Sequence, residues 1–315
     1  MKKCEICSEP SDGRHFGVVS CRACAQFFRR CLTSDTNFVK PCDIQCELNI
    51  KCRRLCSMCR FQKCKAVGMC EKHEKPKKGK MLKRLSNFYR RLENRKLEEW
   101  PIREEVRINY ILMNATMKQY SIIISKELEI AFPEIKQITE DQLKIIRDNF
   151  ILSFLLVEIS FKSKIATRLL LPNGAYIDYQ NFDLFYDNLI ASKLYKPYWD
   201  FRMNNLVNPI IEAKLNESEF QFLSALIFWD ASLPNLSSET VKLCQKNRQE
   251  IFKELSDYTT FMHQDKSSIR VAKIVLLLNG ISVSVETFNH QLIISKLHGV
   301  EIYHETMHTL NGLEL

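Results

Sequence analysis

Two stretches near the start of the chain decide its fold: CEIC at residues 4–7 and CRACAQFFRR at residues 21–30. Each contains a Cys-x-x-Cys pair, and two thiolates at this spacing can bind one tetrahedral Zn²⁺ at a turn or at the start of a helix. The second pair continues at once into paired aromatic and paired arginine residues. A bound metal would nucleate this helix, and the basic residues that it carries indicate a surface that binds phosphate groups.

The cysteines are concentrated in the N-terminal part of the chain. Of the 13 cysteines, 12 lie between Cys4 and Cys70, and Cys244 stands alone in the remaining sequence. A secreted disulfide scaffold is the competing explanation for such a density. The odd count, the first residues without the apolar segment of a signal peptide, and the long cysteine-poor remainder argue against it. We therefore expect reduced, metal-bound cysteines in an intracellular protein.

Charge divides the chain at a similar place. Residues 1–100 contain 24 Lys and Arg against 11 Asp and Glu, a net charge of +13, whereas residues 101–315 contain 22 against 26, a net charge of −4. A basic third attached to a mildly acidic body indicates a polyanionic partner. The most apolar stretch that we identify, residues 150–161, is shorter than the roughly 18 residues of a membrane span. We therefore expect no membrane partner.

The body of the chain has the periodicity of successive helices. The sequence TEDQ at residues 139–142 is typical of a capping box, and apolar residues follow at helical spacing up to Phe161. From Phe150 onward apolar residues occupy every face, which predicts the middle layer of a helical sandwich. Pro172-Asn173-Gly174 predicts the turn of a small hairpin. Further helices are predicted after Asn216, near Ser238 and near Ser268, the last one capped by Gly299.

These patterns predict two domains and a connection between them. A small zinc-stabilised module covers residues 1–75, and a basic hinge covers residues 76–100, of which residues 86–100 have the pattern of a charged helix that ends before Pro101. An all-helical domain, a three-layer sandwich with a small hairpin, covers residues 101–315.

A second group of cysteines follows the first, at residues 42, 46, 52, 56 and 59, and runs into the basic segment CRFQKCK at residues 59–65. Four thiolates leave zinc no open position for water, so each set of four predicts a structural site. A zinc enzyme needs such an open position, and the pattern therefore disfavours an enzyme. Cys31, Cys64 and Cys70 are better explained as small apolar side chains.

At these residues the sequence resembles a known family. HFGVVSCRAC at residues 15–24, FFRR at residues 27–30, and the Cys56-x-x-Cys59-Arg60-x-x-Lys63-Cys64 segment with Gly68-Met69 resemble a nuclear hormone receptor of the divergent type abundant in nematodes. In the body, EDQL at residues 140–143, LPNG at residues 171–174 and NESEF at residues 216–220 resemble the helical ligand-binding domain of that family.

The resemblance implies two structural zinc ions and two crossed helices whose aromatic residues Phe27, Phe28 and Phe61 pack together. One zinc would be held by Cys4, Cys7, Cys21 and Cys24, and the other by Cys42, Cys46, Cys56 and Cys59. The helix that begins near Arg22 would lie in the major groove of double-stranded DNA. The residues implied to contact DNA are His15, Phe16, Arg22, Ala25, Gln26, Arg29, Arg30, Arg60 and Lys63.

Two features depart from the family pattern. Members that bind the common hexamer have Glu and Lys where this chain has Arg22 and Ala25, so we expect a different half-site. Arg22 either contacts guanine or adds one phosphate contact, and the residues leave this open. In the second zinc site three residues separate Cys42 from Cys46 where the family usually has five. Cys52 is therefore an alternative to Cys42 as the ligand, and dimerisation through this loop stays open.

The resemblance also implies a regulated C-terminal domain, in which an apolar ligand repositions a final helix that recruits transcriptional coregulators. The nearest match to that helix, residues 302–307, has Thr306 at an apolar position. No ligand-binding residues are assigned.

We therefore expect a nuclear, sequence-specific transcription factor that regulates RNA polymerase II transcription and is not an enzyme. The alternative is a zinc-stabilised protein-interaction adaptor, or a constitutive corepressor without a ligand.

Overall fold

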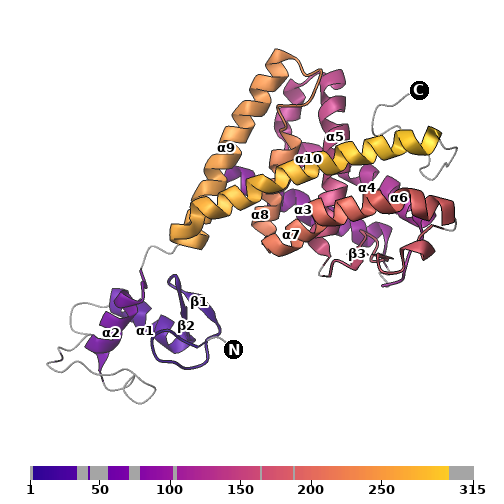
Figure 1. The fold of residues 1–315 in the computed structure, drawn as a ribbon. Coiled ribbons are helices and arrows are strands. Elements are labelled where there is room, and N and C mark those ends of the chain that lie inside the picture. Colours follow the sequence, from indigo (N-terminus) through magenta and orange to yellow (C-terminus); the bar gives the residue numbers. More distant parts are fainter. Residues whose placement is uncertain are drawn as a thin grey trace. The chain divides into compact units, whose positions relative to one another are not determined.

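The computed structural model describes residues 3–33, 42, 56–70, 79–101, 105–163, 165–186 and 189–297. The chain separates into two compact units, Met1–Lys77 and Lys78–Leu315, drawn with their elements labelled in Figure 1. Each unit is described by itself.

The N-terminal unit begins with an antiparallel hairpin of strands β1 (Gly13–His15) and β2 (Val18–Ser20), followed by helix α1 (Arg22–Thr33) and, later in the chain, helix α2 (Ser57–Ala66). The two-residue loop of the hairpin has positive φ angles at both positions, 53° at Phe16 and 86° at Gly17. Such a turn matches the right-handed twist of the paired strands. It brings β2 back so that Cys21 directly precedes α1.

Helix α2 ends in a glycine stop. Gly68 has a φ of 93°, in the left-handed region that favours glycine. The amide of Gly68 donates to the carbonyl of Lys65 at 2.9 Å, and the amide of Met69 donates to the carbonyl of Cys64 at 2.8 Å. This is a Schellman motif, which satisfies carbonyls that the helix leaves open. It also turns Met69 into the buried cluster of the unit.

The buried cluster of the N-terminal unit is small and rich in sulfur. Its members are Cys4, Ile6, Cys7, Val18, Cys21, Cys24, Phe27, Phe28, Cys64 and Met69. The rings of Phe28 and Phe61, from α1 and α2, are 5.8 Å apart, which confirms the predicted aromatic packing between the two helices. So few apolar side chains cannot stabilise a domain of this size without a metal or another crosslink.

The C-terminal unit is almost entirely helical, as the sequence predicts. Its elements are α3 (Lys80–Glu99), α4 (Tyr110–Ala131), the 3₁₀ turn η2 (Pro133–Gln137), α5 (Glu140–Lys162), strands β3 (Arg168–Leu170) and β4 (Tyr176–Asp178), the 3₁₀ turn η3 (Phe182–Leu184), α6 (Leu189–Arg202), the π-helical segment η4 (Met203–Val207), α7 (Asn208–Ala213), α8 (Glu217–Phe228), α9 (Ser238–His263), the 3₁₀ turn η5 (Gln264–Lys266) and α10 (Ser267–Leu297). The predicted Gly299 cap and the segment 302–307 lie outside the described residues.

Helix α5 is the middle layer of this unit. Every residue from Phe150 to Ser160 is buried, and the helix contacts α4, α7, α8 and α10. The predicted hairpin follows it, with Leu169 paired to Ile177. The turn is closed by a hydrogen bond from the amide of Gly174 to the carbonyl of Leu171, 3.0 Å. The sequence patterns therefore identified both the central helix and the hairpin beside it.

The capping box predicted at the start of α5 is replaced by other contacts. Thr139 is the N-cap of α5 but its side chain makes no capping hydrogen bond. Gln142 instead accepts a hydrogen bond from the amide of Ser237 at 2.6 Å and donates to the carbonyl of Asn235 at 3.2 Å. The long-range contact to the start of α9 therefore replaces the local capping box. At the start of α8 the box is present, between Asn216 and Glu219.

The region that we expected to be a hinge, residues 76–100, is different in the structure. Helix α3 occupies most of it, and the buried side chains of α3 include Met81, Leu85, Phe88 and Leu92, which belong to the core of the C-terminal unit. Both carboxylate oxygens of Glu254 accept hydrogen bonds from the first amides of α3. The basic composition conceals this apolar stripe, whose spacing of four, three and four residues is that of a helix.

The most apolar long helix is α10 rather than the 150–161 stretch. Its segment Ser267–Gln291 is long and apolar enough, by length and composition, to cross a membrane, and 28% of the segment is buried. Within the unit α10 contacts α5, α6, α8 and α9. It crosses the other helices in Figure 1, as expected of a core helix with one face open.

The close approach of α10 to η4 depends on Gly280. A Cβ at this position would lie 2.3 Å from the backbone carbonyl oxygen of Asn205, well inside van der Waals contact.

Helix propensity alone favours Gly280→Ala by about 1 kcal/mol. We predict the opposite sign, a loss of about 1–3 kcal/mol in the free energy of unfolding, because a rigid carbonyl must move. Urea unfolding measures the change. Ser282→Ala, at an exposed site on the same helix, is the control, and a stabilised Gly280→Ala variant would contradict the packing argument.

Candidate metal centres and nucleic-acid interface

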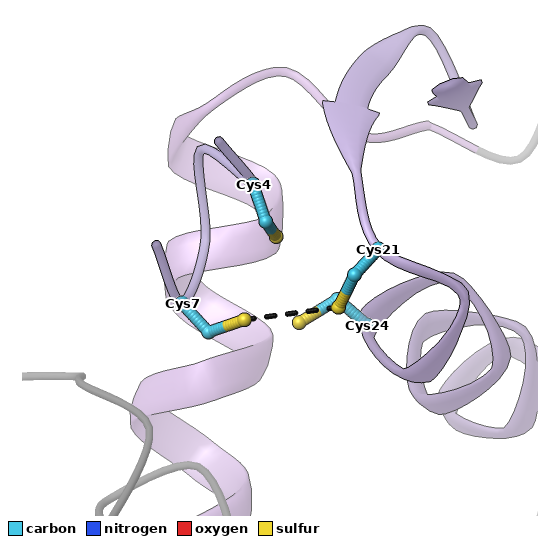
Figure 2. Close-up of side chains that lie close together, drawn as sticks. All are labelled: Cys4, Cys7, Cys21 and Cys24. Carbon is cyan, nitrogen blue, oxygen red and sulfur yellow. Dashed lines mark hydrogen bonds between the residues drawn. The ribbon is translucent and has the colours of Figure 1, made fainter. Parts of the chain in front are cut away.

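The first four predicted zinc ligands converge. The sulfurs of Cys4, Cys7, Cys21 and Cys24 all lie within 4.8 Å of one another, and Figure 2 shows them pointing into a common space. The sulfurs of Cys7 and Cys21 are 3.7 Å apart. In a tetrahedral site with Zn–S bonds of about 2.3 Å, neighbouring sulfurs are separated by about 3.8 Å. The four side chains therefore fit one structural zinc ion.

Local structure explains this convergence. Cys4 and Cys7 lie on either side of a turn, in which the amide of Ser8 donates to the carbonyl of Cys4 at 2.8 Å. Cys21 follows β2, and Cys24 lies in the first turn of α1. All four side chains are buried, and burial raises the pKa of the Cys7 and Cys24 thiols. A bound metal offsets this cost because it coordinates the thiolate form.

The second cluster contains Cys42, Cys56 and Cys59, whose sulfurs also lie within 4.8 Å of one another. Cys56 is the N-cap of α2, and its sulfur accepts a hydrogen bond from the amide of Cys59 at 3.4 Å. Cys46, the predicted fourth ligand, and Cys52, the alternative, lie outside the described residues. Cys42 lies beside the other two sulfurs, as expected if Cys42 rather than Cys52 is a ligand of the second zinc ion.

The remaining cysteines of this unit differ in their surroundings. Cys64 is fully buried, and burial raises the pKa of its thiol to about 12, which makes it unreactive at neutral pH. Cys31 is half-buried, and Cys70 is exposed. The prediction that these cysteines act as small apolar side chains therefore fits the buried Cys64 well and the exposed Cys70 poorly.

Helix α1 presents one exposed face. Its exposed residues at the start of the helix are Arg22, Ala23, Gln26, Arg29 and Arg30. This spacing places them along one side of a helix. Ala25, which we expected to face the bases, is 5% exposed and packs inward, so that expectation is wrong. The helical phase set by the buried Cys24 and Phe28 excludes it, and Ala23 takes its place on the outer face.

Arg60 also differs from its expected position beside the DNA backbone. It is 9% exposed, and its Nη2 donates to the carbonyl of Ala23 at 2.8 Å and to the sulfur of Cys24 at 3.3 Å. The guanidinium lies 4.2 Å from the centre of the Phe27 ring. Arg60 therefore joins α2 to α1 and donates a charge-assisted hydrogen bond to a ligand of the first zinc site.

The hairpin holds the first arginine of the exposed face. Asp12 accepts a hydrogen bond from Nε of Arg22 at 2.7 Å and contacts Nε2 of His15 at 3.1 Å. Both hydrogen bonds lower the pKa of Asp12, and the bond to His15 contributes more than the bond to Arg22. Phe16 packs edge-on against Phe28 at 5.1 Å. Lys63, the last predicted contact, is exposed on α2.

Two family models match the chain in the places that this geometry indicates. Residues 2–71 match the double treble clef zinc finger of C4 type, and residues 98–298 match the ligand-binding domain of nuclear hormone receptor. The chain belongs to the nuclear hormone receptor family. Similar proteins include the nuclear hormone receptor family members nhr-42 and nhr-108 of Caenorhabditis elegans, which are both 28% identical to this receptor. The first match covers 96% of each chain, and the second covers 95% of this chain and 94% of the relative.

Membership establishes the class of function. The receptor is a DNA-binding transcription factor with a ligand-binding domain, and its two cysteine clusters fit two structural zinc ions. Nuclear receptors are transcription factors rather than enzymes and are generally nuclear. Nothing in the described part of the chain favours the adaptor alternative.

The C-terminal unit contains a pocket of about 270 Å³ among α3, α5 and the β3–β4 turn. Five charged residues line it beside apolar ones such as Ile159 and Leu170, whereas the family's ligand site is expected to be mainly apolar. Lys96 and Glu158 form an ion pair at 2.8 Å with both side chains buried, and Glu93 contacts Lys96 at 3.2 Å and Lys162 at 3.3 Å. These four charges pair with one another, and a fifth charged residue of the lining, Glu105, is exposed.

We predict that Cys42, not Cys52, binds the second zinc. Cys42→Ala should therefore reduce the zinc content from two ions to one per chain, whereas Cys52→Ala should keep both, because Cys42 already lies beside Cys56 and Cys59. Zinc is counted by atomic emission on the purified chain. A Cys42→Ala protein that retains both ions would exclude this ligand set.

We predict that Arg60 supports the first zinc site. In the Co²⁺-substituted protein, Arg60→Met should shift the sulfur-to-metal charge-transfer band to longer wavelength and weaken metal binding by about 10–100-fold, because the thiolate of Cys24 loses a hydrogen bond. Lys63→Met is the control: it removes the same charge one turn away on α2 without touching a cysteine sulfur. An unchanged spectrum for Arg60→Met would show that the contact does not tune the metal.

Proposed function

We propose that this receptor binds double-stranded DNA by placing the exposed face of α1 in the major groove. The observation that supports this most directly is the face itself: Arg22, Gln26, Arg29 and Arg30 project outward from a helix whose first turn contains Cys24 of the zinc site. A metal-anchored helix start gives these side chains a rigid position. Receptor modules of this type dock a helix in the same way.

The residues of this face have different proposed roles. Arg22 and Gln26, near the start of the helix, suit base contacts, because arginine recognises the acceptors of guanine and glutamine pairs with adenine. Arg29 and Arg30, about one turn beyond Gln26, suit phosphate contacts, and so does Lys63 on α2. His15 and Phe16, at the tip of the hairpin, complete the set proposed to contact DNA.

The proposed half-site differs from the family's common hexamer because of Arg22. Asp12 orients Arg22 before DNA binds, since the ion pair holds a side chain that is otherwise 83% exposed. A side chain fixed in advance loses less conformational entropy when it binds. The ion pair between Asp12 and Arg22 therefore supports a contact of Arg22 with a base, rather than an additional phosphate contact by a mobile side chain.

The finer aspects of function are also proposals. We propose that the receptor acts in the nucleus, regulates RNA polymerase II transcription, recruits coregulators through its C-terminal domain, and has no enzymatic activity. For the domain limits we propose a DNA-binding module up to about residue 75 and a ligand-binding domain that includes α3. The contacts of α3 with α4, α8 and α9 support that limit.

A salt series on the full-length chain tests DNA binding. Affinity for random duplex DNA should fall steeply with salt, by a slope of about −0.9 in log–log form for each phosphate contact. Arg29→Ala should lower the slope by about one unit and weaken all sequences equally. Arg22→Ala should instead change the preferred site selected from a random duplex pool. Lys193→Ala, in the C-terminal unit, is the control for charge. Binding that is weak and independent of salt would favour the adaptor function.

A further inference from the structure

Asp12 places a carboxylate beside the helix that is proposed to enter the major groove. Its side chain is 37% exposed and pairs with Arg22, the first residue of α1. A negative group close to DNA lowers affinity, because it faces phosphates of the same charge. An exposed ion pair also adds little to stability. The informative property of this pair is therefore its geometry rather than its strength.

The pair divides the nitrogens of Arg22 into two groups. Nε donates to Oδ2 of Asp12 at 2.7 Å, whereas Nη1 and Nη2 make no hydrogen bond in the described part of the chain. Guanine presents two acceptors in the major groove, O6 and N7, and the fork of a guanidinium matches both of them. The carboxylate thus restrains Arg22 through Nε and leaves the two terminal nitrogens available as a fork.

The hairpin fixes the carboxylate in turn. Oδ1 of Asp12 contacts Nε2 of His15 at 3.1 Å. The neighbouring Ser11 donates through its hydroxyl to the carbonyl of Ser20 at 2.9 Å, at the end of β2 and two residues before Arg22. The segment that contains Asp12 is therefore tied to the strand that leads into α1. A side chain held in this way loses less conformational entropy when it binds.

The carboxylate also makes phosphate a poor partner for Arg22. A phosphate that approached the guanidinium would meet the negative charge of Asp12, whereas guanine is neutral. We infer that Asp12 is a specificity-determining residue, which directs Arg22 to a guanine base instead of the DNA backbone. Asp12 acts through Arg22 and is a positioning residue. This inference rests on the proposed DNA-binding function and names the base that the start of α1 recognises.

Sites selected from a random duplex pool by the full-length chain test the identity of the base. Arg22→Ala should lose discrimination at one base pair of the selected site, by about 5–150-fold, and this pair should contain guanine. Replacing that guanine by 7-deazaguanine, which lacks the N7 acceptor, should weaken binding of the native chain and leave that of Arg22→Ala unchanged. Another base pair at this position, or unweakened binding of the native chain to the 7-deaza site, would overturn the inference.

Variants of Asp12 test its role. Asp12→Ala should bind random duplex DNA more tightly, because a negative charge is removed, and should discriminate about fivefold less or worse at the same guanine. Asp12→Asn keeps an oxygen that can accept from Nε, and should retain more of the discrimination. Glu5→Ala is the matched control, since it removes an exposed carboxylate of the same unit that does not pair with Arg22. It should keep the preference for guanine in full.

The combined variant separates a positioning role from a structural one. Asp12→Ala together with Arg22→Ala should discriminate as Arg22→Ala does alone, because a residue that acts through another has no further effect once the other is removed. Zinc content is measured for each variant, so that a lost metal site is recognised. Native preference for guanine in Asp12→Ala, or a further loss of discrimination in the combined variant with both zinc ions bound, would overturn the inference.

The native chain distinguishes the two levels of failure. If it binds the random pool weakly and independently of salt, the DNA-binding function fails, and the role of Asp12 fails with it. If it binds in a salt-dependent way and Asp12→Ala keeps the native preference, only the role of Asp12 fails.

Discussion

The coordination of metal by thiolates is the interaction on which the N-terminal unit depends. Its buried cluster contains only as many large apolar side chains as cysteines, five of each, and could not by itself offset the entropy of folding. The four converging sulfurs replace that missing core. They also determine function, because Cys24 lies in the first turn of α1 and so fixes the direction of the helix that presents Arg22 and Gln26.

Contacts around the zinc sites extend this constraint through the unit. Arg60 directly follows Cys59 of the second cluster and donates to Cys24 of the first. A single side chain therefore joins the second cysteine cluster to α1, the helix proposed to bind DNA. The Schellman motif at Gly68 and the hairpin turn at Phe16 join in the same network, since the amide of Cys70 donates to the carbonyl of Phe16 at 3.3 Å.

The C-terminal unit relies on apolar burial, and its buried charges are satisfied in most places. Glu219, with no exposed side-chain surface, caps α8, pairs with Arg270 of α10 and contacts His263 of α9. Removing one partner from such a network leaves a buried charge unpaired, which costs several kcal/mol, about 3–5 in measured cases.

The sequence by itself indicated the paired cysteines of two metal sites, the helical character of the body, the buried middle helix α5 and the hairpin, because each depends on spacing between near neighbours. It also identified the receptor family from its motifs. Tertiary structure alone decided the roles of other residues: Ala25 turns inward, Arg60 binds Cys24 instead of facing DNA, and Gln142 bonds to residues more than 90 positions away. The basic segment before Pro101 became a core helix for the same reason. A side chain's partner from a distant segment is set by how the helices pack, and local spacing contains no record of that packing.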